Sequence, residues 1–365
     1  MSAIKDKVAQ AIESVSGSKS PDELPWHPDN TKLPTRKNLP SIPGAPEGAA
    51  WVWGKDDYVS ALDAPQMVND MDMLGRLNLL TPARVKAAAA AEIKTGELVP
   101  LNLPLNVPET PAFGREKFVH TIKPLLENIA YDDKYELNTQ SGTQWDGFRH
   151  TKGKDILGPE ANHNCSIHHW ANHGIAGRGV LLDYWAYAKA NGVEYDPYTS
   201  HAITFDELYK CGKAQGIDIR PEAQGGDIKV GDILMIRSGF VDSYYSRTPE
   251  ERTQLALRPH VVGPDDGQRY AGVAQEDAIL DWLHDCYFAA VVGDAPAFER
   301  WPSLKEYYVH EYILALWGMP LGEMWDLEKL AAKCREANRW SFFMTSAPAN
   351  VPAGVSSHAN ATAIF

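Results

Sequence analysis

The sequence predicts an α/β protein in which strands and helices alternate along most of the chain. Helix start signals recur, short apolar runs of strand length lie between them, and no internal repeat or low-complexity tract interrupts the pattern. With 365 residues the chain can bury a large hydrophobic core. These observations favour a mixed α/β domain.

The first 48 residues differ from the rest. Ile4, Val8, Ile12 and Val15 have helical spacing, which predicts a short N-terminal helix. Residues 19–48 contain seven prolines, which is typical of an extended arm. We therefore expect a helix and arm over 1–48, which either wrap the main domain or a neighbouring subunit or form a free tail, and one large domain over 49–365.

Local capping signals place the first helices. Thr81 and Pro82 provide an N-cap and a first-turn proline for a helix over 83–95. Thr204 and Glu207 form a capping box before a helix that reaches about residue 214. Further helices are expected at 275–286, 304–317 and 326–337.

Short apolar runs predict strands at 98–103, 180–183, 233–237 and 288–292. A longer strand is expected over 135–146. At a period of two, Gln140, Gly142, Gln144 and Asp146 would share one polar face. Gly142 would leave a gap in that face, where something other than protein could approach the backbone. This pattern is typical of a binding or catalytic site.

The same segment, continued to His150, carries a recognisable motif, Gln140-x-Gly142-Thr143-Gln144-x-Asp146-x-x-x-His150. It resembles the signature His-x-Gly-Thr-His-x-Asp-x-x-x-His of the cyclase family of metal-dependent hydrolases, which includes bacterial kynurenine formamidases and isatin hydrolases. Four of the six signature positions match. The two that differ, Gln140 and Gln144, stand where the family has metal-ligating histidines.

The resemblance extends over roughly residues 50–365, through segments similar to family strands at 177–183, 230–239, 346–350 and 360–361. It implies an antiparallel-rich β barrel or sandwich core wrapped by helices, of the swivelling β/β/α type. It also implies a homodimer or larger homo-oligomer.

The resemblance further implies a divalent metal, manganese or zinc, held by Asp146, His310 and Glu323 with Gln140 and Gln144. A glutamine offers only a neutral carbonyl oxygen, which binds transition metals less well than imidazole does. Two interpretations stay open: a metal site with altered ligands, and a site that has lost its metal.

The implied activity is a hydrolase that opens a cyclic amide or lactone or cleaves an aryl formamide. His150 would be the general base and Glu323 a second catalytic group, while Trp145 and Phe148 would line the pocket for a cyclic or aromatic small molecule. The alternatives are a metal-free isomerase or dehydratase, and a binding protein that keeps the pocket without catalysis.

A second possible metal site is a group of four histidines at 163, 168, 169 and 173. His169 and His173 have the i, i+4 spacing that places two imidazoles on one helix face. No glutamate follows His169, as a zinc protease helix would require. A polar helix that ends at Gly174 is the better interpretation.

Several other classes are disfavoured by composition. The 35 basic and 48 acidic residues give a net charge of −13, which argues against nucleic acid and anionic membranes as partners. Four scattered cysteines and the lack of a signal peptide or long apolar stretch favour the cytoplasm. Phosphate-binding and dinucleotide motifs are absent, so no nucleotide cofactor is expected.

Overall fold

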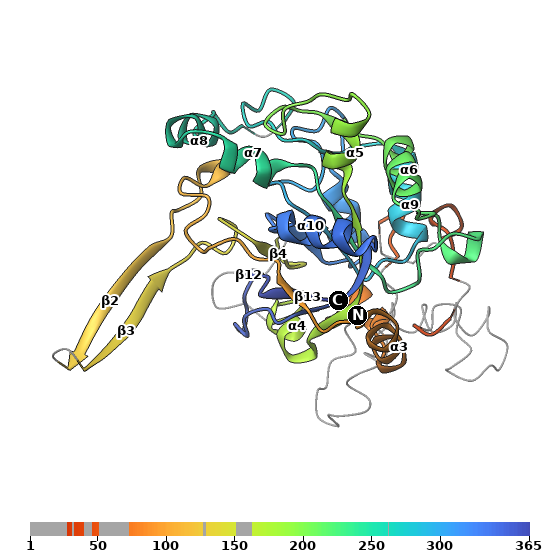
Figure 1. The fold of residues 1–365 in the computed structure, drawn as a ribbon, viewed down its shortest axis with the longest axis horizontal. Helices are drawn as coiled ribbons and strands as arrows, with labels where there is room; N and C mark the ends of the chain where they lie inside the picture. Colours follow the sequence, from red (N-terminus) through yellow and green to blue (C-terminus); the bar gives the residue numbers. More distant parts are fainter. Residues whose placement is uncertain are drawn as a thin grey trace.

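The computed structural model describes residues 28–30, 33–39, 46–50, 73–126, 129–150, 163–261 and 263–365. The helix expected over residues 1–18 lies outside these ranges. In the described part, the chain forms a curled, mixed nine-stranded half-barrel with helices around it (Figure 1). The prediction of an α/β protein is confirmed.

The large sheet combines a parallel centre with antiparallel flanks. Its strand order is β1-β13-β11-β5-β7-β9-β10-β4-β12. The strands are β1 (Leu98–Pro100), β4 (Gln144–Asp146), β5 (Ile175–Leu182), β7 (Ile233–Ile236), β9 (Ala290–Gly293), β10 (Leu321–Glu323), β11 (Ser341–Ser346), β12 (Ser356–His358) and β13 (Ala361–Ile364). Strands β5, β7, β9 and β10 run parallel, and the remaining neighbours pair antiparallel. Every residue of β7 and β9 is buried, as expected for parallel strands covered on both faces.

Helices cover this sheet. The main ones are α3 (Pro82–Glu92), α4 (His168–His173), α5 (Tyr184–Ala190), α6 (Phe205–Ala214), α7 (Phe240–Ser246), α8 (Pro249–Ala256), α9 (Asp277–Asp285) and α10 (Glu328–Ala337). Helix α3 contacts β5 and β11, and α6 contacts β5 and α9. In the described ranges, every helix is too short or too polar to reach across a lipid bilayer.

The capping signals located their helices well. Thr81 caps α3, and Thr204 and Glu207 form the expected capping box on α6. The helix expected over 304–317 is reduced to a π-helical turn, η7 (Glu311–Leu316). Before it, the Ser303 hydroxyl accepts a hydrogen bond from the Lys305 amide and donates one to the Tyr307 carbonyl. This side chain holds residues 303–307 in a loop where a helix was predicted.

The strand expected over 135–146 was wrong in extent. Its first two residues, 135–136, end the hairpin of β2 (Val119–Leu126) and β3 (Ala130–Glu136), residues 137–143 form a loop, and its last three residues form β4. At Gly142 the backbone of another segment approaches closely, because a Cβ there would lie 3.1 Å from the Val107 carbonyl oxygen, and Gly142 also lines a hollow of about 340 Å³.

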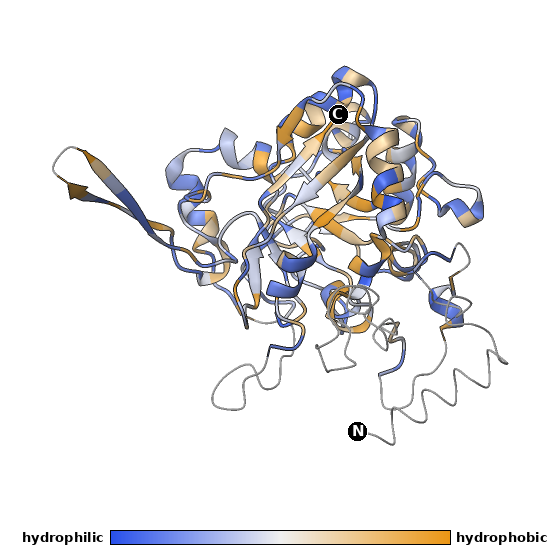
Figure 2. Cartoon of the chain, turned by 90° about the horizontal axis from the view of Figure 1, so that it is seen from below, coloured by the Kyte–Doolittle hydropathy of each residue, from blue (hydrophilic) through white to orange (hydrophobic). Residues whose placement is uncertain are grey.

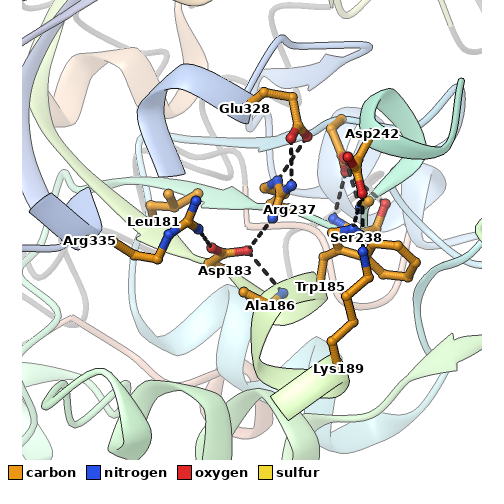
Figure 3. A network of polar contacts seen from close by, with 12 residues as sticks. Leu181, Asp183, Trp185, Ala186, Lys189, Arg237, Ser238, Asp242, Glu328 and Arg335 are labelled. Atoms are coloured by element: carbon orange, nitrogen blue, oxygen red, sulfur yellow. Dashed lines mark hydrogen bonds and ion pairs between the residues drawn. The ribbon is translucent and has the colours of Figure 1, made fainter. Parts of the chain in front are cut away.

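A partly buried ionic network joins three elements near the ends of the parallel strands (Figure 3). Arg237 donates to Asp183 at 2.8 Å and to both carboxylate oxygens of Glu328, while Arg335 donates to Asp183 at 2.6 Å. Although burial opposes the charge, the two carboxylates raise the Arg237 pKa above its usual value. Arg237 therefore connects β7 to α5 and α10, which is a structural role.

Residues 36–37 of the N-terminal arm lie against α9. Arg36 donates from its backbone amide to Asp285 and from its side chain to Asp281, each at 2.6 Å. Lys37 adds an ion pair with Asp281 at 2.7 Å. These contacts hold residues 36–37 on the main domain.

Candidate active site

Two neighbouring strands, β4 and β10, bring the carboxylate of Asp146 close to that of Glu323, which lies far along the chain. Strands β4 and β10 pair antiparallel, with Gln144 opposite Glu323 and Asp146 opposite Leu321. Because side chains alternate along a strand, Gln144, Asp146 and Glu323 project from the same face. All three are buried, with at most 2% of their surface exposed.

His310 reaches this face from the start of η7. Its Nε2 lies 3.0 Å from Glu323 Oε1 and 3.9 Å from Asp146 Oδ2, and its Nδ1 lies 2.7 Å from Glu299 Oε1. Glu299 also accepts the backbone amides of Val309 and His310. The imidazole is therefore fixed between two carboxylates.

The two glutamines complete the polar cluster. Gln140 approaches from the loop before β4, and its amide donates to Asp146 Oδ1. The Gln144 amide donates to Gln140 Oε1 at 2.8 Å and to Glu323 Oε2 at 3.1 Å. The structure thus brings together five of the predicted residues: Gln140, Gln144, Asp146, His310 and Glu323.

Burial and close charges shift the protonation equilibria of this cluster. Burial raises the pKa of Glu323, and the nearby Asp146 carboxylate raises it further, while His310 opposes the shift. For His310, burial lowers the pKa, but hydrogen bonds to Glu299 and Glu323 outweigh it and hold the pKa well above its usual value. The cluster therefore retains protons readily.

Two buried oxygens identify where a cation would fit. Gln144 Oε1 and Asp146 Oδ2 accept no hydrogen bond within the described part of the chain, and an unsatisfied buried acceptor is costly. Ligand atoms of Asp146, His310 and Glu323 all lie within 4.8 Å of one another. The other ring nitrogen of His310 contacts Glu299, an arrangement common for metal-bound histidines. The residues present fit a divalent metal.

The remaining predicted residues lie outside this cluster. Trp145 alternates with Gln144 and Asp146, so it projects from the opposite face of β4. There it is fully buried, packs edge-on against Trp170 and Trp325, and donates to the Ser346 hydroxyl. Phe148 is also buried against Trp170. Substrate contact by either ring stays a prediction.

His150 follows β4 in a turn closed by its own amide, which donates to the Gly147 carbonyl at 2.9 Å. Its side chain is half-buried and does not belong to the group formed by Asp146, His310 and Glu323. Gly147 permits this turn to pack closely, since a Cβ there would lie 2.3 Å from the Val355 carbonyl oxygen. The role of His150 as general base stays a prediction.

Sequence reasoning missed Glu299, although it is the fully buried partner of His310. It lies in a loop six residues after β9 and belongs to no motif in the chain. Its one signal is a carboxylate between Phe298 and Arg300, close after an apolar strand, which is too common to identify a site. Its function depends on a contact with His310, eleven residues away.

The histidine group does not form a second metal centre. Helix α4 begins at His168 and ends at Gly174, as expected. His169 Nε2 lies 3.0 Å from the His163 carbonyl, and His173 Nδ1 lies 2.6 Å from the Gly174 carbonyl. In the ranges that the structure covers, the one group of acidic, cysteine and histidine ligands close enough for a metal is at Asp146.

Comparisons with known proteins agree with this geometry. A family model described as Putative cyclase matches residues 99–300, more than half of the chain. A solved structure described as a novel cyclase is similar at 26% identity and a TM-score of 0.66, covering 80% of this chain and 96% of that one.

Two isatin hydrolases A share the fold. The one from Ralstonia solanacearum has 16% identity and a TM-score of 0.53, covering 78% of this chain and 98% of its own. The one from Labrenzia aggregata, bound to benzyl benzoate, has 14% identity and a TM-score of 0.50, covering 76% and 96%. None of the curated protein sequences searched matches the chain. The expected cyclase-like fold is confirmed, and the chain belongs to the cyclase family.

Proposed function

We propose that this chain is a metal-dependent hydrolase that opens a cyclic amide or a lactone, or cleaves an aryl formamide. The observation that carries the proposal is the buried group of Asp146, His310 and Glu323, beside two acceptor oxygens that have no hydrogen-bond partner among the described residues. A cyclic aromatic amide is the first substrate to test, because isatin hydrolases share this fold.

The ligand set favours manganese over zinc. Asp146, Glu323 and the glutamine carbonyls are oxygen donors, which suit harder cations, and His310 Nε2 is the single imidazole nitrogen. A divalent metal bound there would supply Lewis-acid chemistry, which polarises a carbonyl and makes water more acidic.

The protein residues would move the protons. Glu299 fixes the His310 ring through Nδ1, so Nε2 faces Glu323 and Asp146. As a ligand of the bound metal Glu323 would be ionised, so the proton for the leaving nitrogen or oxygen would come from His150. We assign to His150 the removal of the proton from the attacking water. The four free cysteines suit a cytoplasmic enzyme.

A second candidate is supported by the two glutamine amides. Gln140 donates to Asp146, and Gln144 donates to Glu323, so N–H groups already satisfy carboxylate oxygens that a metal would otherwise bind. The site could then function without a metal, either as an isomerase or dehydratase that uses Glu323, or as a binding site for a small molecule.

Turnover before and after chelation distinguishes the two candidates. Isatin, a simple lactone and an aryl formamide would be incubated with protein purified without a metal-chelating column. Loss of hydrolysis on chelation and its return with manganese support the first candidate. Asp146→Asn should abolish turnover, whereas Asp206→Asn, in an exposed ion pair on α6, should not. Hydrolysis that is unaffected by chelation would refute the metal dependence.

A further inference from the structure

A narrow cavity adjoins the candidate active site at the base of the β2–β3 hairpin, which extends away from the body of the protein (Figures 1 and 2). Arg115 precedes β2 and Gln140 follows β3, and both line this cavity. Helices α7 and α8, near the base of the hairpin in Figure 1, add Tyr244 and Arg252. Because Gln140 also donates to Asp146, the cavity and the candidate site share a residue.

The cavity wall carries two positive charges. Among the described residues that line it, Arg115 and Arg252 are charged and none is acidic. The hydrogen bonds that these two guanidinium groups donate to described residues go to backbone carbonyls, and none goes to a carboxylate. Elsewhere in the chain, the half-buried Arg178 and the buried Arg237 each pair with an aspartate. In a chain with a net charge of −13, two unpaired arginines at one cavity indicate an anion site.

Aromatic rings orient the two guanidinium groups. Arg115 lies over Phe113, 5.2 Å from the ring centroid, and Arg252 lies over Tyr244 at 4.4 Å. Arg115 also donates to the Gln140 carbonyl at 2.8 Å. The Nε of Arg252 is buried and has no hydrogen-bond partner among the described residues. Since a buried donor without an acceptor is costly, a ligand that accepts its hydrogen bond would be stabilised here.

The size of the cavity limits the group that can enter it. Its volume is about 20 Å³, and one water needs about 10–15 Å³. The space therefore suits a group with one or two oxygens. The two oxygens of a carboxylate match the planar fork of a guanidinium. The neighbouring rings of Tyr198, Phe240 and Tyr270 are buried, and a surrounding of low polarity strengthens the attraction between the charges.

We propose that the substrate of this enzyme is a cyclic or aromatic compound that bears a carboxylate, and that Arg115 and Arg252 bind this carboxylate. This inference rests on the proposed function and narrows its substrate class. Gln140 connects the two parts of the site, since its carbonyl accepts from Arg115 and its amide donates to Asp146. The amide or ester to be cleaved lies at the metal-binding cluster, beyond Gln140. A neutral compound such as isatin leaves both guanidinium groups without an anion.

Binding of benzoate and benzamide tests the site, because the two compounds have similar size and differ in charge. Titration calorimetry at pH 7 on the metal-depleted chain keeps metal and turnover out of the result. Benzoate should bind about tenfold more tightly than benzamide, and Arg115→Gln or Arg252→Gln should each weaken benzoate binding by about tenfold. Arg220→Gln removes an exposed arginine that pairs with Asp218, and this control should bind benzoate as the wild type does.

Circular dichroism would establish that each variant is folded. If Arg115→Gln does not fold, Arg252→Gln decides the outcome alone, since Arg252 is half-buried on α8. Absence of benzoate binding, equal binding of benzoate and benzamide, or unchanged benzoate binding by a folded arginine variant would overturn the inference.

Turnover separates this inference from the proposed function. The manganese-loaded enzyme would be assayed with the isomers of formamidobenzoate and with formanilide, which lacks the carboxylate. The best isomer should exceed formanilide in kcat/KM by about tenfold, and either arginine variant should lower that ratio, mainly through KM. Equal hydrolysis of both compounds would overturn the inference and leave the proposed hydrolase intact. Benzoate binding that depends on both arginines, without hydrolysis of either formamide, would support the carboxylate site and count against the hydrolase.

Discussion

Replacing His310 by alanine tests the geometry of the cluster through stability. The ring contacts Glu299 at 2.7 Å and Glu323 at 3.0 Å, and both carboxylates are buried. Removing one partner of a buried ion pair costs about 3–5 kcal/mol, because the remaining charge is left without compensation. Total stabilities are about 5–15 kcal/mol. His310→Ala should therefore lose a large fraction of the free energy of unfolding.

The assay is urea unfolding of metal-depleted protein at pH 7, so that loss of a bound metal does not contribute. Lys210→Ala is the control, since its pair with Asp206 on α6 is exposed and should be worth about 0.3–0.5 kcal/mol. If His310→Ala lost less than about 1 kcal/mol, the ring could not lie between two buried carboxylates, and the described cluster would be refuted.

Three further outcomes are expected. Gln140→His with Gln144→His should raise manganese and zinc affinity in titration calorimetry; unchanged affinity would mean that neither side chain is a ligand. His150→Ala should remove nearly all hydrolysis and leave thermal unfolding unchanged, and retained turnover would eliminate it as the base. Burial lowers the pKa of His284 from 6.5 to about 4, so the unfolded chain takes up a proton first as pH falls. Stability should be full above pH 6.5 and drop by about 3 kcal/mol toward pH 4, and His284→Gln should flatten that dependence in urea titrations; an unchanged slope would contradict the assignment.

The elements that could be predicted are those fixed by short-range chemistry. The cap at Thr81 and the capping box at Thr204 act within four residues, and both helices begin where expected. The strand predicted over 135–146 was wrong because its alternating pattern continues across a loop. Within this segment, only Gln144–Asp146 pairs with a strand on each side. Its partners, β10 and β12, lie far along the chain.

The candidate site also has a part that could be predicted from local sequence and a part that depends on contacts between distant residues. The motif from Gln140 to His150 is local and was visible in the sequence, but the meeting of Asp146 with His310 and Glu323 was expected only from the family resemblance. Glu299 could not be found, since its role depends on the position of His310 in the folded chain. The β2–β3 hairpin was also missed, because Pro124 and the charged residues of its strands obscure any alternation of apolar and polar residues.

The central claim is that the buried cluster binds a divalent metal. The most direct measurement is elemental analysis of protein purified without a metal-chelating column and then incubated with manganese, for the wild-type chain beside Asp146→Ala. We expect near-stoichiometric metal in the wild type and its loss in the variant. Wild-type protein that holds no manganese or zinc after reconstitution, or an Asp146→Ala variant that retains it, would contradict the account.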